Sequence, residues 1–355
     1  MFVELCAWDN LLLAYRRAAK GKRGHPNVAA FEHDLEGNLY QLQAELRAMT
    51  YLPGAYVNFT IHEPKQRLIS AAPFRDRVVH HALCNLIEPI YERSFVVNSY
   101  ANRVGKGTHR ALDRVQALAR RYPYVWQCDV RQFFPSIDHT LLRDMLASKV
   151  ADPQVRWLMD RILAGGAGVL RDAYDMQDFF GDDLFAPLRP RGLPVGNLTS
   201  QFWANVYLNG FDHFVVRQLR CRGYVRFVDD LLFFADDKPS LWAWQTAVVA
   251  RLRTLRLTIH PGSHPRPVGE GIPFLGFVVW PHRRRLKRRK VVAYRRVLRR
   301  LIADYRAGRL RLAQVSASVR GWVNHASHAN TVGLRKALFR RHPLRTSRPS
   351  PKEVS

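Results

Sequence analysis

Two short apolar runs, Tyr224-Val-Arg-Phe-Val228 and Leu231-Leu-Phe-Phe-Ala235, are separated by only two residues, Asp229 and Asp230. Runs of this length that are rich in β-branched and aromatic residues are typical of strands. A two-residue connection between two such runs predicts a β-hairpin. We therefore expect both aspartates at the hairpin tip, with buried strands on either side.

A third carboxylate, Asp129, ends another apolar strand, Tyr124-Val-Trp-Gln-Cys-Asp-Val130. An Asp-Asp pair alone is weak evidence, since Asp182-Asp183 and Asp236-Asp237 lie in polar segments, and a solvated turn is the alternative for the hairpin tip. Three carboxylates at one end of a sheet could hold two Mg²⁺ ions about 3.5–4 Å apart, which activate an attacking hydroxyl and stabilise a leaving pyrophosphate. Asp138, at the start of the next helix, is better suited to capping that helix.

The remaining pattern alternates helices with short strands and predicts an α+β fold with an antiparallel sheet. One irregular loop is expected over 165–194, because Gly, Pro and Asp are frequent there. The expected helices cover 27–46, 76–95, 108–121, a segment from 138, a segment after 153, 199–219, 239–256, a basic helix after 290, a segment around 314–325, and 334–339. The expected strands are a hairpin within 56–69, 124–130, 224–228, 231–235, 257–260 and 274–280.

Charge is distributed unevenly along the 355 residues. The chain is 47% hydrophobic, enough to bury a core and to exclude disorder as the main state, and its formal net charge is +27. Residues 281–355 hold 22 basic and two acidic residues. Because apolar residues are interleaved with this basic run, it predicts a folded element that binds a polyanion, with a disordered basic tail as the alternative.

The four cysteines, Cys6, Cys84, Cys128 and Cys221, are far apart and form no CxxC pair. They predict buried thiols in a reducing compartment, with no zinc site and no disulfide framework. No apolar run approaches the roughly 18 residues of a membrane span, and Glu4 lies where a signal peptide would be basic. We expect a soluble cytoplasmic protein with no membrane partner.

Three segments in order, Gln127-Cys-Asp-Val-Arg-Gln-Phe-Phe134, Gly192-Leu-Pro-Val-Gly-Asn-Leu-Thr-Ser-Gln201 and Phe227-Val-Asp-Asp230, resemble palm motifs A, B and C of reverse transcriptases. The resemblance covers roughly 56–340, with Phe274-Leu-Gly-Phe277 at the position of the primer grip. It implies a right-hand polymerase fold. The expected division is an N-terminal helical extension (1–55), fingers (56–123), palm with part of the fingers inserted (124–280), basic helical thumb (281–345) and flexible tail (346–355).

The resemblance also implies roles for individual residues. Asp129 and Asp229 would be the principal Mg²⁺ ligands, Asp230 the third catalytic carboxylate, and the Val130 carbonyl a further metal ligand. Phe134 would be a steric gate against a ribose 2′-hydroxyl, with plain core packing beside Phe133 as the alternative. Expected contacts to the incoming dNTP are Lys65, Arg67, Phe134, Val195, Gly196 and Gln201. Expected contacts to template and primer are Arg75, Arg103, Arg295, Arg296, Arg299 and Arg300.

Motif B departs from the pattern Q-G-x-x-x-S-P, because Val195 replaces the Gln and Gln201 replaces the Pro. In this it is similar to the reverse transcriptases of diversity-generating retroelements, which copy a template RNA and misincorporate at adenines. A neutral lineage variant is the alternative. The implied partners are template RNA, an RNA–DNA duplex, dNTPs and a small basic accessory variability protein. The alternatives are a group II intron-like, retron-like or phage-defence reverse transcriptase, or a non-catalytic RNA-binding palm scaffold.

Overall fold

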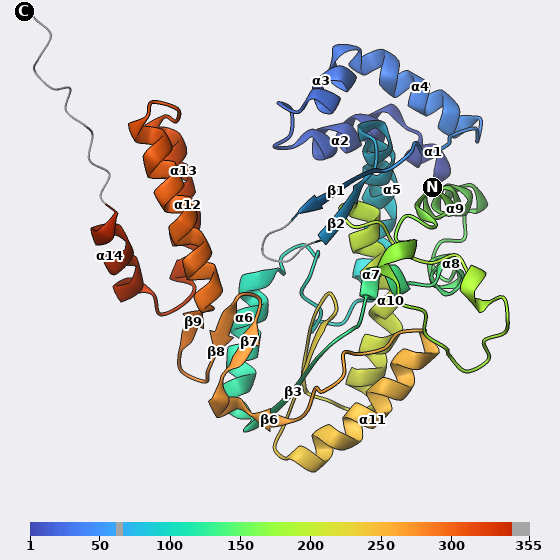
Figure 1. Cartoon of the computed structure of the whole chain (residues 1–355). Coiled ribbons are helices and arrows are strands. Elements are labelled where there is room, and N and C mark those ends of the chain that lie inside the picture. The colour runs from blue at the N-terminus through green and yellow to red at the C-terminus, as the bar shows by residue number, and fades with distance from the viewer. Residues whose placement is uncertain (62–66, 343–355) are drawn as a thin grey trace, which may run out of the picture. The chain divides into compact units, whose positions relative to one another are not determined.

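A computed structural model describes residues 1–61 and 67–342, which form two compact units (Figure 1). The expected basic turn with Lys65 and the expected tail 346–355 lie outside the described residues. The first unit comprises Met1–Gly107, Trp126–Phe233 and Pro239–His264, and the second comprises Thr108–Val125, Phe234–Lys238 and the chain from Pro265 onward. The finer division into extension, fingers, palm and thumb stays a prediction.

The N-terminal helices are α1 (Phe2–Leu5), α2 (Trp8–Ala19), α3 (Pro26–His33) and α4 (Leu35–Arg47). The prediction of one helix over 27–46 is wrong, because the chain breaks at Asp34. The Asp34 carboxylate accepts a hydrogen bond from the Gly37 amide and caps α4. A Cβ on Gly37 would lie 2.3 Å from an Asp34 carboxylate oxygen, so a larger residue there would require the capping side chain to move.

The predicted hairpin before the palm is confirmed as β1 (Val57–Ile61) and β2 (Arg67–Ala71), which pair antiparallel with Val57 opposite Ala71. The helix that follows, α5 (Phe74–Glu92), buries one stripe that includes Val78, Val79, Ala82, Leu83 and Ile87. It contacts both α2 and α10 (Leu198–His213). These helices therefore form the core beneath the hairpin.

The sheet of the first unit contains β4 (Gly223–Phe227), β5 (Asp230–Ala235) and β3 (Tyr124–Asp129), in the spatial order β4-β5-β3. The predicted hairpin of β4 and β5 is confirmed, and four of the β5 side chains are completely buried. The other helices of this unit are α7 (Phe133–Ser136), α8 (His139–Ala147), α9 (Pro153–Gly166) and α11 (Lys238–Thr254). The expected strand at 257–260 forms only a single antiparallel bridge between Ile259 and Val130.

The connections in this unit follow the sequence expectations closely. The expected loop 165–194 is irregular after α9 ends at Gly166, apart from the short helices η1 (Arg171–Ala173) and η2 (Ala186–Leu188). The helix α10 continues into a π-helical turn, η3 (Phe214–Gln218), which accounts for the long helix expected up to 219.

The second unit contains α6 (Thr108–Arg121), and the start of β3 pairs there with β6 (Arg266–Pro267), which is followed by η4 (Val268–Glu270). A three-stranded antiparallel sheet follows, made of β7 (Ile272–Phe274), β8 (Phe277–Val279) and β9 (Arg284–Leu286). The single strand expected over 274–280 is wrong, because the chain turns at Leu275 and Gly276, which have φ angles of 45° and 89°.

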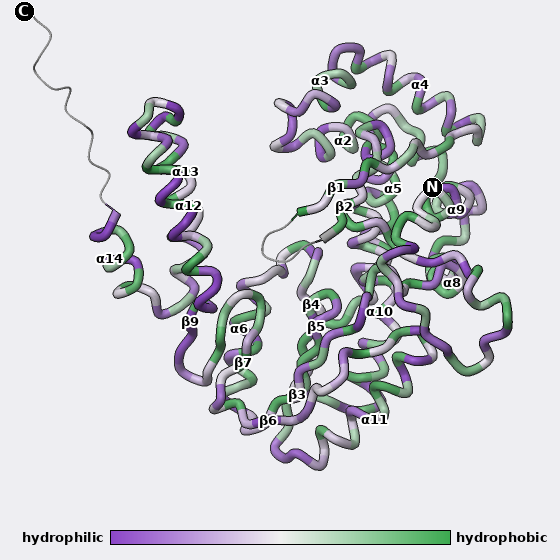
Figure 2. Tube along the Cα trace, in the orientation of Figure 1, coloured by the Kyte–Doolittle hydropathy of each residue, from purple (hydrophilic) through white to green (hydrophobic). Residues whose placement is uncertain are grey.

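The C-terminal helices are α12 (Arg288–Arg306), α13 (Leu312–Ser327) and α14 (Val332–Arg341), as the sequence predicts. Tyr294, Leu298, Ile302 and Leu338 form their core, and the Tyr294 ring stacks on Trp322 with 4.3 Å between centroids. Hydrophilic and hydrophobic residues alternate along α12, as Figure 2 shows. The basic run is therefore part of a packed helical element at least as far as residue 342.

All four cysteines are buried and free, in agreement with the sequence prediction. Among residues 1–61 and 67–342, no helix combines the length and the apolar character that crossing a bilayer requires.

Candidate active site

The end of β3 and the tip of the β4–β5 hairpin lie next to each other. The Val130 amide donates a hydrogen bond to the Asp229 carbonyl at 3.2 Å, which joins the two segments that carry the predicted metal ligands. The Asp129 carbonyl accepts from the His260 amide at 2.9 Å, and an Asp129 carboxylate oxygen lies 3.7 Å from the His260 Nε2 atom. The Asp129 side chain is 46% exposed and accessible to a ligand.

The hairpin tip differs in one respect from the expectation. Val228 and Asp229 form the turn, whereas Asp230 is the first residue of β5. Val228 has a φ of +58°, a left-handed conformation that costs energy for a β-branched residue. Backbone strain of this kind persists only where surrounding contacts hold it.

Cys128 lies beneath these carboxylates. Burial raises the pKa of its thiol well above the usual value, and the negative charges of Asp129 and Asp230 raise it further. The thiol is therefore neutral and inert at physiological pH.

The donor chemistry of Asp129, Asp229 and Asp230 fits Mg²⁺, which prefers carboxylate oxygens. In the part of the chain that the structure describes, however, no group of three His, Cys, Asp or Glu side chains is already arranged to hold a metal ion. The two-Mg²⁺ site therefore stays a prediction, supported by the adjacent backbones of Val130 and Asp229.

Phe133 and Phe134, the last two residues of motif A, differ in exposure. Phe133 is 2% exposed and belongs to the core, whereas Phe134 is only half-buried, and the two ring centroids are 5.5 Å apart. The Phe134 carbonyl accepts a hydrogen bond from the Leu193 amide at 2.9 Å, which connects this segment to the start of motif B. Core packing thus explains Phe133 and leaves the Phe134 ring available to a substrate.

Motif B is hydrogen-bonded to strand β2. The Ser70 amide donates to the Val195 carbonyl at 2.9 Å, and the Asn197 side chain accepts from the Ala72 amide and donates to the Ser70 carbonyl. Gly196 has a φ of +118°, and a Cβ there would lie 2.9 Å from Ile69. Sequence reasoning missed Asn197, which is 2% exposed, because nothing in the sequence distinguishes it from a surface residue of a loop.

The predicted basic contacts have different surroundings. Lys65 lies outside the described residues, and Arg67 begins β2. Arg75 forms an ion pair with Glu45 and lies over the Tyr51 ring.

Arg103 does not support the role that the sequence predicts. Its side chain is only 5% exposed, and its guanidinium donates to Glu92 and to the carbonyls of Val96 and Ser99. Because its guanidinium donates hydrogen bonds to groups inside the fold, we assign Arg103 a structural role and not a contact with the template.

The predicted template and primer contacts on α12 differ in exposure from the buried Tyr294 and Leu298 of the same helix. Three of the four predicted contacts, Arg296, Arg299 and Arg300, are exposed. The fourth, Arg295, is half-buried, and its Nε atom is buried without a hydrogen-bond partner among the described residues.

A family model described as reverse transcriptase (RNA-dependent DNA polymerase) matches residues 61–277. Protein YkfC of Escherichia coli K12 is 25% identical over 199 residues, which cover 53% of this chain and 48% of that protein. The group II intron-encoded protein LtrA of Lactococcus lactis is 24% identical over 185 residues, covering 51% of this chain and 29% of that protein. The chain thus spans less than half the length of these relatives.

Solved structures are also similar. An apo telomerase structure from Candida tropicalis aligns with a TM-score of 0.49 at 9% identity, covering 66% of this chain and 49% of that one.

Proposed function

Since this chain belongs to the reverse transcriptase family and has its right-hand polymerase fold, we propose that it copies RNA into DNA at Asp129, Asp229 and Asp230. The observation that carries this proposal is the hydrogen bond between the Val130 amide and the Asp229 carbonyl, which brings motif A beside motif C. It supplies the proximity that three carboxylates need to act on one reacting phosphate.

Asp129, Asp229 and Asp230, with the Val130 carbonyl, would hold the two ions. Bound Mg²⁺ would activate the primer 3′-hydroxyl and stabilise the leaving pyrophosphate. The chain's own contribution is to fix the donors. The amide of Val130 holds the hairpin tip, and the backbone contact of Asp129 with His260 holds the end of β3.

The substrate contacts follow from the surfaces beside the carboxylates. The ring of Phe134, which is half-buried, would exclude a ribose 2′-hydroxyl. Motif B, with Val195, Gly196 and Gln201, would line the base-pair side, and Lys65 and Arg67 of the fingers hairpin would bind the triphosphate through charge-assisted hydrogen bonds. We retain Arg75 as a template contact, in which case its ion pair with Glu45 must open.

The test is primer extension on an RNA template with Asp229→Asn. We expect loss of at least about a thousandfold in Mg²⁺-dependent DNA synthesis, because a metal ligand is removed while the side-chain volume is kept. Asp236→Asn is the matched control, since Asp236 is exposed beyond the end of β5 and is part of an Asp-Asp pair of its own. Near-parental synthesis by Asp229→Asn would overturn the proposed site.

We further propose that the enzyme belongs to a diversity-generating retroelement, is error-prone at template adenines and acts with a small basic accessory protein. The support is motif B, where Val195 replaces a Gln that can contact the nascent base pair, so that one hydrogen-bonded check on pairing is lost. Sequencing of the cDNA tests this directly. Errors spread evenly over the four template bases would exclude the mutagenic assignment and leave the polymerase intact.

A group II intron-like enzyme is the second candidate, because LtrA, one of the matched relatives, is encoded by such an intron. The two candidates differ in the same experiment, since an excess of substitutions at template adenines is expected only for the first.

A further inference from the structure

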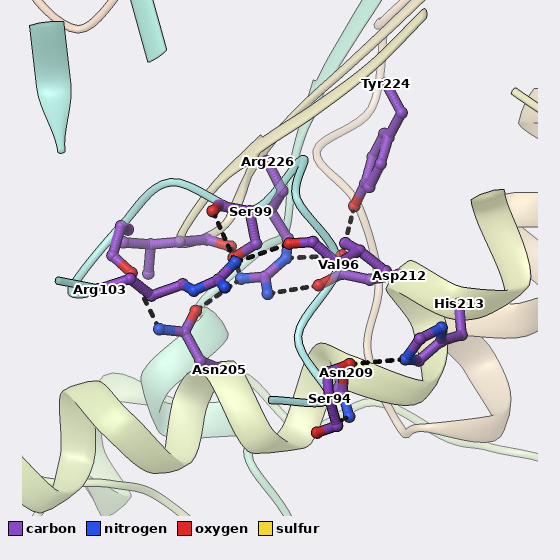
Figure 3. A network of polar contacts seen from close by, with 12 residues as sticks. Ser94, Val96, Ser99, Arg103, Asn205, Asn209, Asp212, His213, Tyr224 and Arg226 are labelled. Carbon is purple, nitrogen blue, oxygen red and sulfur yellow. Dashed lines mark hydrogen bonds and ion pairs between the residues drawn. The ribbon is translucent and has the colours of Figure 1, made fainter. Parts of the chain in front are cut away.

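Arg226 is a charged residue inside the buried strand β4, three positions before Asp229. Its side chain is completely buried, and so is that of Asp212, which lies on α10. The Arg226 guanidinium donates from Nε to one Asp212 oxygen at 2.8 Å and from Nη2 to the other at 2.6 Å (Figure 3). This bidentate pair fixes the orientation of the guanidinium plane.

The remaining guanidinium nitrogen, Nη1, points to the hairpin tip. It donates to the carbonyl of Val228 at 3.2 Å and to the Asn205 side-chain oxygen at 3.0 Å. Val228 is the strained residue of the turn, with a φ of +58°, and it immediately precedes Asp229. The guanidinium therefore restrains the one peptide whose orientation sets the direction of the Asp229 side chain.

The backbone of Arg226 is held equally firmly. Its amide donates to the Asn98 carbonyl at 2.9 Å, and its carbonyl accepts from the Tyr100 amide at 3.0 Å. These bonds cover the free edge of β4, and Asn98 also donates from its side chain to the Tyr224 carbonyl. Asn205 is similarly secured, because it donates to the Ala101 carbonyl at 2.9 Å. The side-chain bond to the Val228 carbonyl connects this network to the turn.

The electrostatics favour a permanently charged pair. Burial lowers the pKa of Arg226, but the Asp212 carboxylate outweighs this effect and the net shift is upward. Buried ion pairs contribute little net stability compared with apolar residues of the same shape, and their best-supported role is to specify one arrangement. A buried, fully bonded arginine beside a strained turn fits that role.

We propose that Arg226 is a positioning residue, which uses Asp212 and Asn205 of α10 as a fixed support and holds the Val228–Asp229 turn in its metal-binding conformation. Because Leu198–Gln201, the second part of motif B, forms the first turn of α10, the support connects motif B to the carboxylates. This inference rests on the proposed function of Asp229.

The experiment compares Arg226→Lys with Tyr224→Phe in the full-length chain. A lysine keeps the charge opposite Asp212, but a single ammonium cannot bind both Asp212 oxygens and the Val228 carbonyl in the fork geometry of a guanidinium. Tyr224→Phe removes a 2.7 Å hydrogen bond to the same Asp212 from the same strand and leaves the Val228 contact intact. It is therefore the matched control for damage to the buried network alone.

We expect Arg226→Lys to raise the Mg²⁺ concentration for half-maximal primer extension by about 10- to 100-fold, the usual effect of losing a supporting contact around a metal site. The KM for dNTP and the affinity for template–primer should stay within about twofold of the parent values, because the substrate surfaces are untouched. Tyr224→Phe should lower Tm and leave the Mg²⁺ requirement unchanged.

If Arg226→Lys does not fold, the double variant Asp212→Asn with Arg226→Gln removes both charges together and avoids an unpaired buried ion. It should show the same increase in Mg²⁺ requirement. A parental Mg²⁺ requirement in a folded Arg226 variant would overturn the inference and leave a structural ion pair. The Asp229→Asn variant distinguishes failure of this inference from failure of the proposed function. If Asp229→Asn is inactive while the Arg226 variants behave like the parent, the positioning role of Arg226 is wrong and the proposed function of Asp229 stands.

Discussion

At the scale of the residue, the neighbours Phe133 and Phe134 differ in burial although both lie in the short helix α7. The helix follows Gln132, whose backbone is left-handed with a φ of 46°, and successive residues of a helix point in different directions. Phe133 fills the core, and Phe134 remains half-buried beside the start of motif B.

We predict that Phe134→Val increases incorporation of ribonucleotides relative to deoxyribonucleotides by about 10- to 200-fold, which is the range in which pockets discriminate a single small group. The reason is that shortening the ring opens the space a 2′-hydroxyl requires. Single-nucleotide extension with matched ribo- and deoxyribonucleotides measures the ratio.

Phe133→Leu is the control, because it shortens a core ring in the same helix. It should lower the free energy of unfolding and leave sugar selectivity unchanged. Equal selectivity changes in both variants would show that the effect comes from distortion of α7 and that Phe134 is no gate.

At the scale of elements, the helical periodicity of α12 places its apolar side chains and most of its arginines on different faces. Tyr294, Leu298 and Ile302 recur at steps of four and are buried in the helical core, with Val297 packed against them. This burial confirms the predicted apolar stripe. On the predicted arginine face, Arg296, Arg299 and Arg300 are exposed, whereas Arg295 is half-buried. Its function as a duplex-binding surface remains a proposal.

We predict that replacing Arg296, Arg299 and Arg300 together by Gln weakens binding of an RNA–DNA duplex and flattens its dependence on salt. Each phosphate contact contributes about 0.7–0.9 to the slope of log K against log salt concentration, so the magnitude of the slope should fall by about 2 to 3. Fluorescence anisotropy at several salt concentrations measures it.

The matched control replaces Arg16, Lys20 and Lys22 by Gln, which removes the same charge from exposed positions near the N-terminus. This variant should keep the parental slope. An equal reduction in both variants would mean that net charge, and not the α12 surface, determines binding.

At the scale of the whole molecule, we expect the buried histidine of α5 to contribute to the response of stability to acid. His80 is 1% exposed, and its ring lies 3.5 Å from the Thr199 hydroxyl on α10. Burial lowers its pKa to about 3, with smaller effects from the charges of His81 and Arg77. Burial likewise lowers the pKa of His81 to about 4.

These pKa shifts determine whether stability rises or falls as the pH decreases. The folded state binds protons on these histidines less well than the unfolded state, in which a histidine pKa is about 6.5. The stability is therefore fully present above pH 6.5 and falls as the pH decreases toward 4, by up to about 1.4 kcal/mol per pH unit for His80 alone.

We predict that urea denaturation gives a free energy of unfolding that decreases between pH 6.5 and 4, and that His80→Gln makes this decrease shallower. His33→Gln, at an exposed position of α3, should leave the slope unchanged. A parental slope in His80→Gln would show that other groups control acid unfolding.

The sequence by itself determined the family motifs, the hairpin with its two aspartates, most helices and the apolar stripe of α12. These features depend on local periodicity, turn composition and strand propensity, all of which act between residues close in the chain. The sequence-based prediction was wrong where a cap or a turn interrupts a pattern, at Asp34 and at Leu275-Gly276. A cap or a turn of this kind requires little free energy and leaves the hydrophobic pattern intact.

Only the tertiary structure decided which polar residues inside apolar segments support the site. It also decided which of the predicted template contacts instead form hydrogen bonds inside the protein. The sequence shows Arg226 as a charge in a strand and Arg103 as a basic finger residue. Their partners, Asp212 and Glu92, are 14 and 11 residues away along the chain. A buried charge must be satisfied by whatever the folded chain brings to it, and no local pattern encodes that partner.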